Sequence, residues 1–104
     1  MSLLRLRSPD GRWAFRVVEG QAATLGRAPT AALRVQDVSV ARTHARIADR
    51  GGRWYVQDLR SRNGVVVNGL QIEDESELRA GDTLRLGQVE LEVDVTAAAD
   101  TGAS

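Results

Sequence analysis

The chain contains no cysteine and no lysine, a single histidine, and only two tryptophans, one tyrosine and one phenylalanine among its 104 residues. Without cysteine, a disulfide framework, a thiolate nucleophile and a cysteine metal site are all excluded. The longest strongly apolar run is Val65-Val66-Val67. That run is far short of the roughly 20 residues that span a bilayer, and no basic segment followed by an apolar stretch opens the sequence. We therefore expect a cytoplasmic domain with no membrane partner.

The formal net charge is zero, but the two signs are distributed unevenly. Residues 26–62 carry eight arginines and three acids, whereas residues 63–104 carry nine acids and two arginines. Arginine supplies every basic side chain, which codon usage alone would explain. The functional explanation is that guanidinium groups suit phosphate and carboxylate. Only the positions of the arginines separate these two explanations.

Apolar and polar residues alternate along most of the sequence. A chain of 104 residues is long enough for one domain with a single hydrophobic core. In residues 89–95 valine or leucine alternates with acids, which is the period of a half-buried strand, and Trp13, Phe15 and Val17 alternate in the same way. Further strands are expected at 3–7, 23–26, 33–35, 45–49, 54–58, 65–67, 77–79 and 83–86.

Turn residues such as Asn63-Gly64, Asn68-Gly69 and Gly81-Asp82 separate these segments, and no helix of useful length emerges. The pattern predicts an all-β fold, an antiparallel β-sandwich. Residues 96–104 lose the alternation. We therefore expect a domain over residues 1–95, followed by a flexible C-terminal tail or the start of a linker over 96–104.

His44 invites an enzyme interpretation because it is the only imidazole in the chain. It could act as a base, but neither a nucleophile-elbow pattern nor a cysteine accompanies it. The acidic run 73–77 lacks the spacing of a calcium loop, so we expect a solvated loop there, and one histidine does not make a metal site. We predict no enzyme activity, no metal and no cofactor.

Three segments, 24–35, 39–47 and 54–69, each join a strand to a loop rich in arginine, serine or asparagine. In a sandwich such loops gather at one end. Guanidinium, hydroxyl, amide and backbone N–H groups that converge there form an anion receptor. The side chains that could meet in this way are those of Arg27, Arg42, Ser61, Arg62 and Asn63.

These residues also resemble a known family. Gly26-Arg27, Arg42 two residues before His44, "DL" followed by Ser61 and Asn63-Gly64, then Asn68-Gly69 and "RAGDTLRLG", are similar in order and spacing to the forkhead-associated (FHA) domain. The resemblance covers about residues 13–95. It implies an eleven-stranded β-sandwich whose recognition loops at one end hold a phosphothreonine-containing peptide, with the termini at the opposite end.

The resemblance also implies roles for single residues. Arg27 matches the phosphate-binding arginine, and Arg42 matches a loop position that often assists it. Asn63 matches the asparagine that hydrogen-bonds the main chain of the bound peptide, and Asn68 matches a second asparagine that supports the loop or touches the peptide. The expected phosphopeptide-binding residues are Arg27, Arg42, Ser61, Arg62, Asn63 and Asn68, and the expected structural residues are Gly26, His44, Gly64 and Gly69.

The chain departs from the family pattern at two positions that matter. Ala41 replaces a serine whose hydroxyl donates to the phosphate, and a hydrogen bond to a charged group contributes about 1.5–3 kcal/mol. Its loss would weaken binding roughly ten- to a hundredfold. Arg62 stands where many members have threonine, and its charge could offset the missing hydroxyl. Val65, where threonine is common, matters less.

The expected partner is a phosphothreonine-containing protein, the product of a Ser/Thr kinase, and we expect a monomer. Ala41 leaves open a phosphate-independent protein–protein interaction module. Nucleic-acid binding is disfavoured by the zero net charge and the few aromatic residues. We expect a module of a longer protein. Phosphorylation of Thr96 or Thr101, with binding of that tail by the domain itself, is a further alternative.

Overall fold

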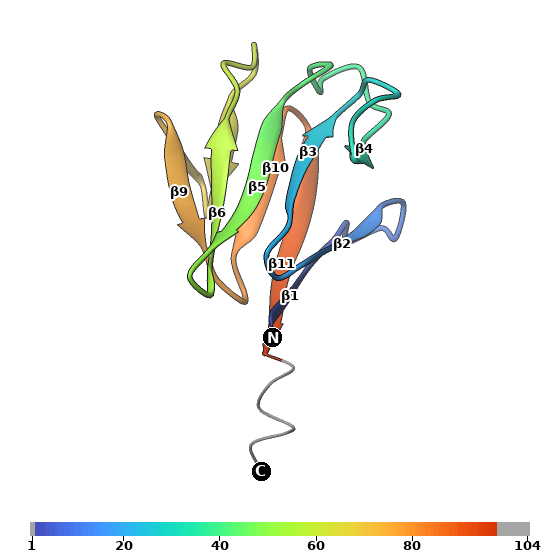
Figure 1. Cartoon of the computed structure of the whole chain (residues 1–104). Coiled ribbons are helices and arrows are strands. Elements are labelled where there is room, and N and C mark those ends of the chain that lie inside the picture. The colour runs from blue at the N-terminus through green and yellow to red at the C-terminus, as the bar shows by residue number, and fades with distance from the viewer. Residues whose placement is uncertain (1, 98–104) are drawn as a thin grey trace.

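The computed structural model describes residues 2–97, which form two sheets packed face to face (Figure 1). The first sheet has the strand order β2-β1-β11-β10-β7-β8, and the second has the order β4-β3-β5-β6-β9. The strands are β1 (Ser2–Arg7), β2 (Ala14–Val18), β3 (Ala22–Gly26), β4 (Leu33–Arg34), β5 (Ala45–Arg50), β6 (Arg53–Asp58), β7 (Val65–Val67), β8 (Leu70–Gln71), β9 (Glu75–Leu78), β10 (Thr83–Leu86) and β11 (Val89–Ala97). The all-β sandwich and its eleven strands are confirmed.

The pairing is antiparallel except between β3 and β4, which run parallel. Alternation predicted ten of the strands and missed β8. That strand has two residues, and its Leu70 is 75% exposed, so it carries no half-buried pattern. It exists because the Asn68-Gly69 turn folds it back onto β7.

The acidic run 73–77 is only partly a loop, which corrects the expectation of a solvated loop. Glu75, Ser76 and Glu77 belong to β9, the edge strand of the second sheet. Charged side chains are common on edge strands because they discourage pairing with another chain. The predicted strand at 77–79 therefore begins two residues earlier than expected, inside the acidic run.

The strand β11 also continues past the predicted end of the domain. Its ladder with β1 pairs Thr96 with Leu3 and Ala97 with Ser2. The predicted boundary between residues 95 and 96 thus falls inside a strand, two residues before the last described one. Thr101 and the rest of the expected tail lie outside the described residues.

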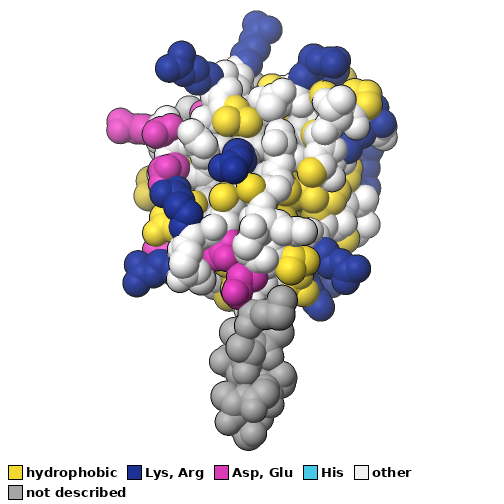
Figure 2. Space-filling model, viewed as in Figure 1, with side chains coloured by type: hydrophobic (Ala, Val, Ile, Leu, Met, Phe, Trp, Pro, Cys, Tyr) yellow, Lys and Arg dark blue, Asp and Glu magenta, His cyan; other side chains and the backbone are white. Residues whose placement is uncertain are grey.

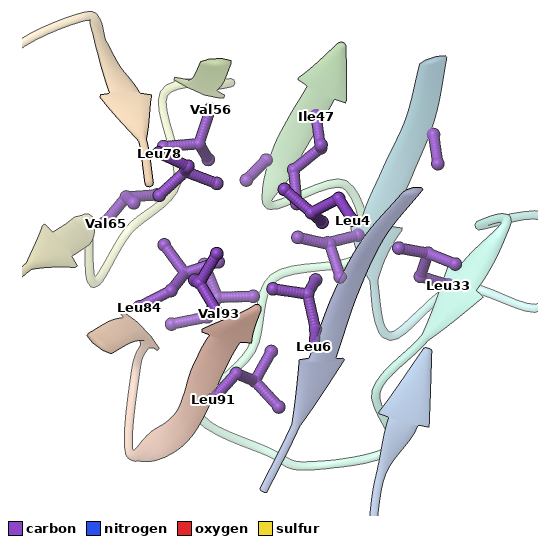
Figure 3. Packing of buried hydrophobic residues seen from close by; sticks show 14 of the residues in the cluster. Leu4, Leu6, Leu33, Ile47, Val56, Val65, Leu78, Leu84, Leu91 and Val93 are labelled. Carbon is purple, nitrogen blue, oxygen red and sulfur yellow. The ribbon is translucent and has the colours of Figure 1, made fainter. Parts of the chain in front are cut away.

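The core lies between the sheets and is built from the inward half of each alternating strand. In Figure 3, Leu4, Leu6, Leu91 and Val93 of the first sheet point into the space that Ile47 of the second sheet also enters. Each of these side chains is at most 2% exposed. Full burial of an aliphatic side chain stabilises a fold by about 1.5–3 kcal/mol, so this core fixes how the two sheets meet.

The sandwich places four connections at one end, which we call the loop end: residues 27–32, 35–44 and 59–64 and the turn 87–88. The described ends of the chain, Ser2 and Ala97, pair with one another at the opposite end of the molecule. Figure 1 shows these loops at the top and the N-terminus below. Segments far apart in sequence therefore meet at the loop end.

Candidate functional site

Arg27 begins the loop after β3 and is fastened to the 35–44 loop. Its backbone N–H donates to the carbonyl of Ala41 at 2.9 Å, and its side-chain Nε donates to the carbonyl of Val40 at 3.1 Å. A guanidinium has five N–H donors. The single Nε bond fixes the direction of the group, and its terminal nitrogens have no hydrogen-bond partner among the described residues.

Gly26 allows this close approach of β3 to the 35–44 loop. A Cβ atom built at this position would lie 2.0 Å from the carbonyl oxygen of Arg42, a separation that real Cβ atoms essentially never show. The neighbouring N–H of Ala28 donates to the same oxygen at 3.2 Å. Glycine is therefore the residue that fits between these backbones.

His44 joins two loops through its ring. The N–H of Ala41 donates to Nδ1 at 2.9 Å, and Nε2 lies 2.7 Å from the carbonyl oxygen of Gly64. Because Nδ1 accepts, the ring proton is on Nε2 and is donated to Gly64. The side chain is fully buried. Both nitrogens are thus occupied, and the imidazole supports the loops.

Ser39 links three connections of the loop end by hydrogen bonds, a role that was not predicted from the sequence. Its carbonyl accepts a hydrogen bond from Asn63 Nδ2 at 2.7 Å, and its hydroxyl accepts one from the N–H of Gln88 at 2.8 Å. The same hydroxyl donates to Asp37 Oδ1 at 2.6 Å. Three connections of the loop end are therefore tied together at one residue. The available signal was the spacing of an aspartate two residues before a serine, which is typical of an Asx turn.

Asp37 stays charged to a lower pH than an ordinary aspartate because of Ser39. The hydroxyl of Ser39 and then its backbone N–H donate to the carboxylate, and both lower the pKa of Asp37 below its usual 3.8. Hydrogen bonds to the charged form favour that form. The only acid of the four loop-end connections is therefore committed to holding its own loop.

The 59–64 loop is held by Asp58, the last residue of the preceding strand β6. Asp58 Oδ1 accepts hydrogen bonds from the N–H of Ser61 at 3.0 Å and from its hydroxyl at 2.7 Å. The hydroxyl proton of Ser61 is therefore used inside the loop. Between these two residues, Arg60 has a φ of 59°, a conformation that non-glycine residues rarely adopt.

Two asparagines expected near a peptide lie in different places. Asn63 is exposed on the loop end, where one of its N–H groups is used by Ser39. Asn68 lies at the far end of β7, where its Nδ2 donates to Asp82 at 3.0 Å and its Oδ1 accepts from the N–H of Thr83 at 2.9 Å. The structure thus separates Asn68 from the other predicted residues and gives it a role in joining two turns.

The glycines of the two Asn-Gly turns both have positive φ, 76° at Gly64 and 82° at Gly69. Gly64 is buried, and a Cβ there would lie 2.5 Å from the side-chain nitrogen of Gln71. At Gly69 nothing lies within 4 Å of such a Cβ. The end of the exposed Gln71 side chain can move aside, so both glycines are constrained mainly by their backbone conformation.

Four exposed arginines lie at the loop end, and the other exposed arginines are spread over the rest of the surface (Figure 2). Figure 2 shows arginine side chains projecting from that end, while the acidic side chains visible in this view lie on the β9 side and near the lower end. Arg50 pairs with Glu75 and Arg79 with Glu77, and neither ion pair involves a loop-end residue. The exposed arginines of the three loops are Arg27, Arg42, Arg60 and Arg62.

The exposed arginines of the loop end suit an anionic guest. No group of three or more histidine, cysteine, aspartate or glutamate side chains within residues 2–97 could hold a metal ion. The same residues include no helix long and apolar enough to cross a membrane. Guanidinium groups without carboxylate partners, beside exposed backbone and amide donors, attract phosphate.

A known family model matches the part of the chain that contains these loops. The model of the FHA domain matches residues 23–87, from β3 through the turn after β10. This chain belongs to the FHA domain family. The family predicted from the arginine, histidine and asparagine spacing is thereby confirmed.

Individual FHA proteins align over most of the chain. FHA domain-containing protein FhaB of Mycolicibacterium smegmatis is 32% identical over 73 residues, which cover 70% of this chain and 47% of FhaB. The chain therefore spans about half the length of that curated relative. The match to the family model, residues 23–87, contains all of the 27–32, 35–44 and 59–64 loops.

Solved FHA domains share the complete sandwich. One, from a structural and functional analysis of phosphothreonine-dependent FHA domain interactions, has 33% identity and a TM-score of 0.83, and the match covers 93% of this chain and 99% of that one. The FhaA FHA domain, complexed with the intracellular domain of Rv3910, has 34% identity and a TM-score of 0.76. That match covers 89% of this chain and 99% of the FhaA domain chain. These neighbours extend the likeness to strands outside the family-model match.

Proposed function

We propose that this domain is a binding module that recognises phosphothreonine in an extended segment of a partner protein. The observation that carries the proposal concerns Arg27 of this FHA domain: its guanidinium is oriented by the Val40 carbonyl and forms no ion pair among residues 2–97. A phosphothreonine at neutral pH has a charge of about −1.5 to −2 and three strong acceptor oxygens. An oriented guanidinium therefore binds it far better than it binds threonine.

Asn63 is suited to a second contact, with the peptide backbone. One N–H of its amide is held by the Ser39 carbonyl, which orients the group, while its side chain remains exposed. An amide has two donor hydrogens and a carbonyl oxygen, so a donor and an acceptor remain for the main chain of a ligand. Such a contact selects an extended ligand without reading its side chains.

The two neighbours named above support this proposal by analogy. One comes from work on phosphothreonine-dependent interactions, and the other is bound to an intracellular domain. We propose a phosphoprotein made by a Ser/Thr kinase as the partner, met in the cytoplasm. The buried His44, with both ring nitrogens occupied, supports binding without catalysis.

The deciding experiment is a calorimetric titration of the domain with a phosphothreonine peptide library and with the matched unphosphorylated library. We expect binding only to the phosphorylated library, and we expect Arg27→Gln to abolish it. Arg53→Gln is the matched control, because Arg53 is also exposed but begins β6, at the other end of the sandwich. Equal affinity for both libraries would refute the proposal.

One observation favours a second candidate, a phosphate-independent interaction module. Ala41 has no hydroxyl, and the hydroxyl protons of Ser39 and Ser61 are both used by aspartates within their own loops. The loop end thus offers the phosphate fewer hydroxyl donors than its serine content suggests. Capture of a cellular partner that survives both phosphatase treatment and Arg27→Gln would support this second function.

A further inference from the structure

The charge of the loop end exceeds what one phosphate neutralises. The 27–32, 35–44 and 59–64 loops carry four exposed arginines and one acid, Asp37, which is hydrogen-bonded by Ser39. A single phosphothreonine supplies about −1.5 to −2 charges. After one phosphate is bound, positive charge therefore remains at the loop end.

The nearby acids do not remove that excess by pairing. The carboxylate of Asp58, the last residue of β6, accepts hydrogen bonds from the N–H and the hydroxyl of Ser61. Asp74 lies beside the base of the 59–64 loop, where its carbonyl accepts a hydrogen bond from the N–H of Asp58 at 2.8 Å, and its carboxylate forms no ion pair among residues 2–97. On β9, Glu75 pairs with Arg50 and Glu77 with Arg79. Among residues 2–97, neither Arg60 nor Arg62 has a hydrogen bond or ion pair from its side chain.

Arg60 is also held in an unusual backbone conformation. Its φ of 59° lies in the left-handed region, which residues other than glycine, asparagine and aspartate rarely adopt. The hydrogen bonds from Ser61 to Asp58 close the turn around it. A long charged side chain kept in a strained turn, beside a binding loop, is a reason to look for a function.

We propose that Arg60 binds a second anionic group of the phosphopeptide, close to the phosphothreonine, and so makes the domain selective for acidic phosphopeptides. This inference rests on the proposed function and assigns Arg27 to the phosphothreonine. The second anion is a carboxylate or another phosphate, because both accept hydrogen bonds from a guanidinium in the same geometry. Arg60 is then a specificity-determining residue.

The test measures dissociation constants by fluorescence anisotropy for three phosphothreonine peptides of equal length. One is flanked by alanine and glutamine, one by glutamate, and one by a second phosphothreonine among alanines. Exposed ion pairs contribute modestly and bidentate ones more, so we expect the glutamate and doubly phosphorylated peptides to bind about three- to tenfold more tightly than the neutral peptide. This advantage should shrink as the salt concentration rises from 50 to 300 mM.

The variant Arg60→Asn removes the charge with a residue that tolerates positive φ. It should erase the advantage of the acidic peptides and leave the neutral peptide within about twofold of its original affinity. Arg53→Asn removes the same charge far from the loop end and should preserve the advantage. The peptide that gains more affinity over the neutral one, the glutamate-flanked or the doubly phosphorylated, identifies whether Arg60 binds a carboxylate or a second phosphate.

Two results would overturn the inference. The first is equal affinity for the neutral phosphopeptide and both acidic ones. The second is tighter binding of the acidic phosphopeptides that Arg60→Asn reduces no more than Arg53→Asn does. In both cases the neutral phosphopeptide still binds better than its unphosphorylated form, so the proposed function stands. If no phosphopeptide binds better than its unphosphorylated form, the proposed function itself fails.

Discussion

His44 Nε2 lies 2.7 Å from the carbonyl oxygen of Gly64, twenty residues away in sequence, inside the loop end. Through Nδ1 the same ring accepts the N–H of Ala41. One buried side chain thus fixes the 35–44 loop relative to the 59–64 loop. The predicted binding residues Arg42 and Asn63 lie on these two loops, so their separation depends on a residue that is itself fully buried.

Replacing His44 with alanine should therefore destabilise the domain. The substitution leaves the Ala41 N–H and the Gly64 carbonyl buried without partners, and each unsatisfied group costs about 1–3 kcal/mol. We expect the free energy of unfolding, measured by urea denaturation, to fall by about 2–4 kcal/mol. Thr43→Ala, at an exposed neighbour, should change it by less than about 0.5 kcal/mol. A loss at His44 no larger than at Thr43 would contradict the supporting role.

Gly26→Ala should displace the 35–44 loop. The added methyl group would meet the backbone carbonyl of Arg42, which has no flexible side chain to move aside. We expect a loss of about 1–3 kcal/mol in unfolding free energy, together with loss of phosphopeptide binding in the calorimetric titration.

Gly69→Ala is the comparison for that variant. Its positive φ of 82° makes alanine strained, by on the order of 1–2 kcal/mol, but nothing lies within 4 Å of the new Cβ. The Gly69→Ala variant should still bind the phosphopeptide, whereas the Gly26→Ala variant should not. Equal binding by both variants would mean that the close approach of β3 does not position the site.

Ala41→Ser should tighten phosphopeptide binding. The new hydroxyl would restore a donor that the existing serines do not supply, because Ser39 and Ser61 donate to Asp37 and Asp58. A hydrogen bond to a charged group of about 1.5 kcal/mol corresponds to roughly a tenfold lower dissociation constant. An unchanged constant would indicate that Arg62 already satisfies the phosphate.

Stability should fall in acid partly through Asp37. The hydroxyl and N–H of Ser39 lower the folded-state pKa of this carboxyl below 3.8. Its contribution is therefore fully present above pH 3.8 and is lost as the pH falls through the lower folded value. Urea denaturation between pH 6 and pH 2.5 should show a smaller decline for Asp37→Asn than for the original chain.

Asp10 is the comparison for that experiment. Its pKa is lowered too, first by the N–H of Arg12, which donates to its carboxylate at 3.0 Å in the β1–β2 hairpin. Asp10→Asn should likewise reduce the decline, and the double variant should reduce it further than either single change. Because the charge of Arg12 lowers the pKa of both carboxyls, we do not expect the two effects to be strictly additive. A decline that none of these variants alters would contradict the assignment.

Much of the fold was predictable because strand alternation is a local property. Leu91 and Val93 face the core and Glu92 faces solvent, as a period of two requires. Leu70 and Gln71 escaped prediction because their pairing with β7 comes from a turn and leaves both exposed. The short parallel contact of β3 with β4 has no local signature either.

The candidate site was predictable in part, through the likeness of its spacing to a family. Arg27, Arg42, Arg62 and Asn63 do lie on loops at one end of the sandwich. Asn68 does not join them, because its turn closes the other end of β7 against Asp82. Arg60 carried no sequence signal, since its strained φ results from the hydrogen bonds of its neighbours.

Which residues point inward and where the chain turns could be predicted from the amino-acid sequence, because both depend on neighbours a few positions apart. The family could be predicted from the order and spacing of several separated motifs. Only the tertiary structure decided which polar groups remain free for a ligand. Ser39 contacts residues 24 and 49 positions away, and those bonds use its hydroxyl and carbonyl. Hydrogen-bond partners are chosen by distance in space, and a serine that is available in the sequence can be fully used in the fold.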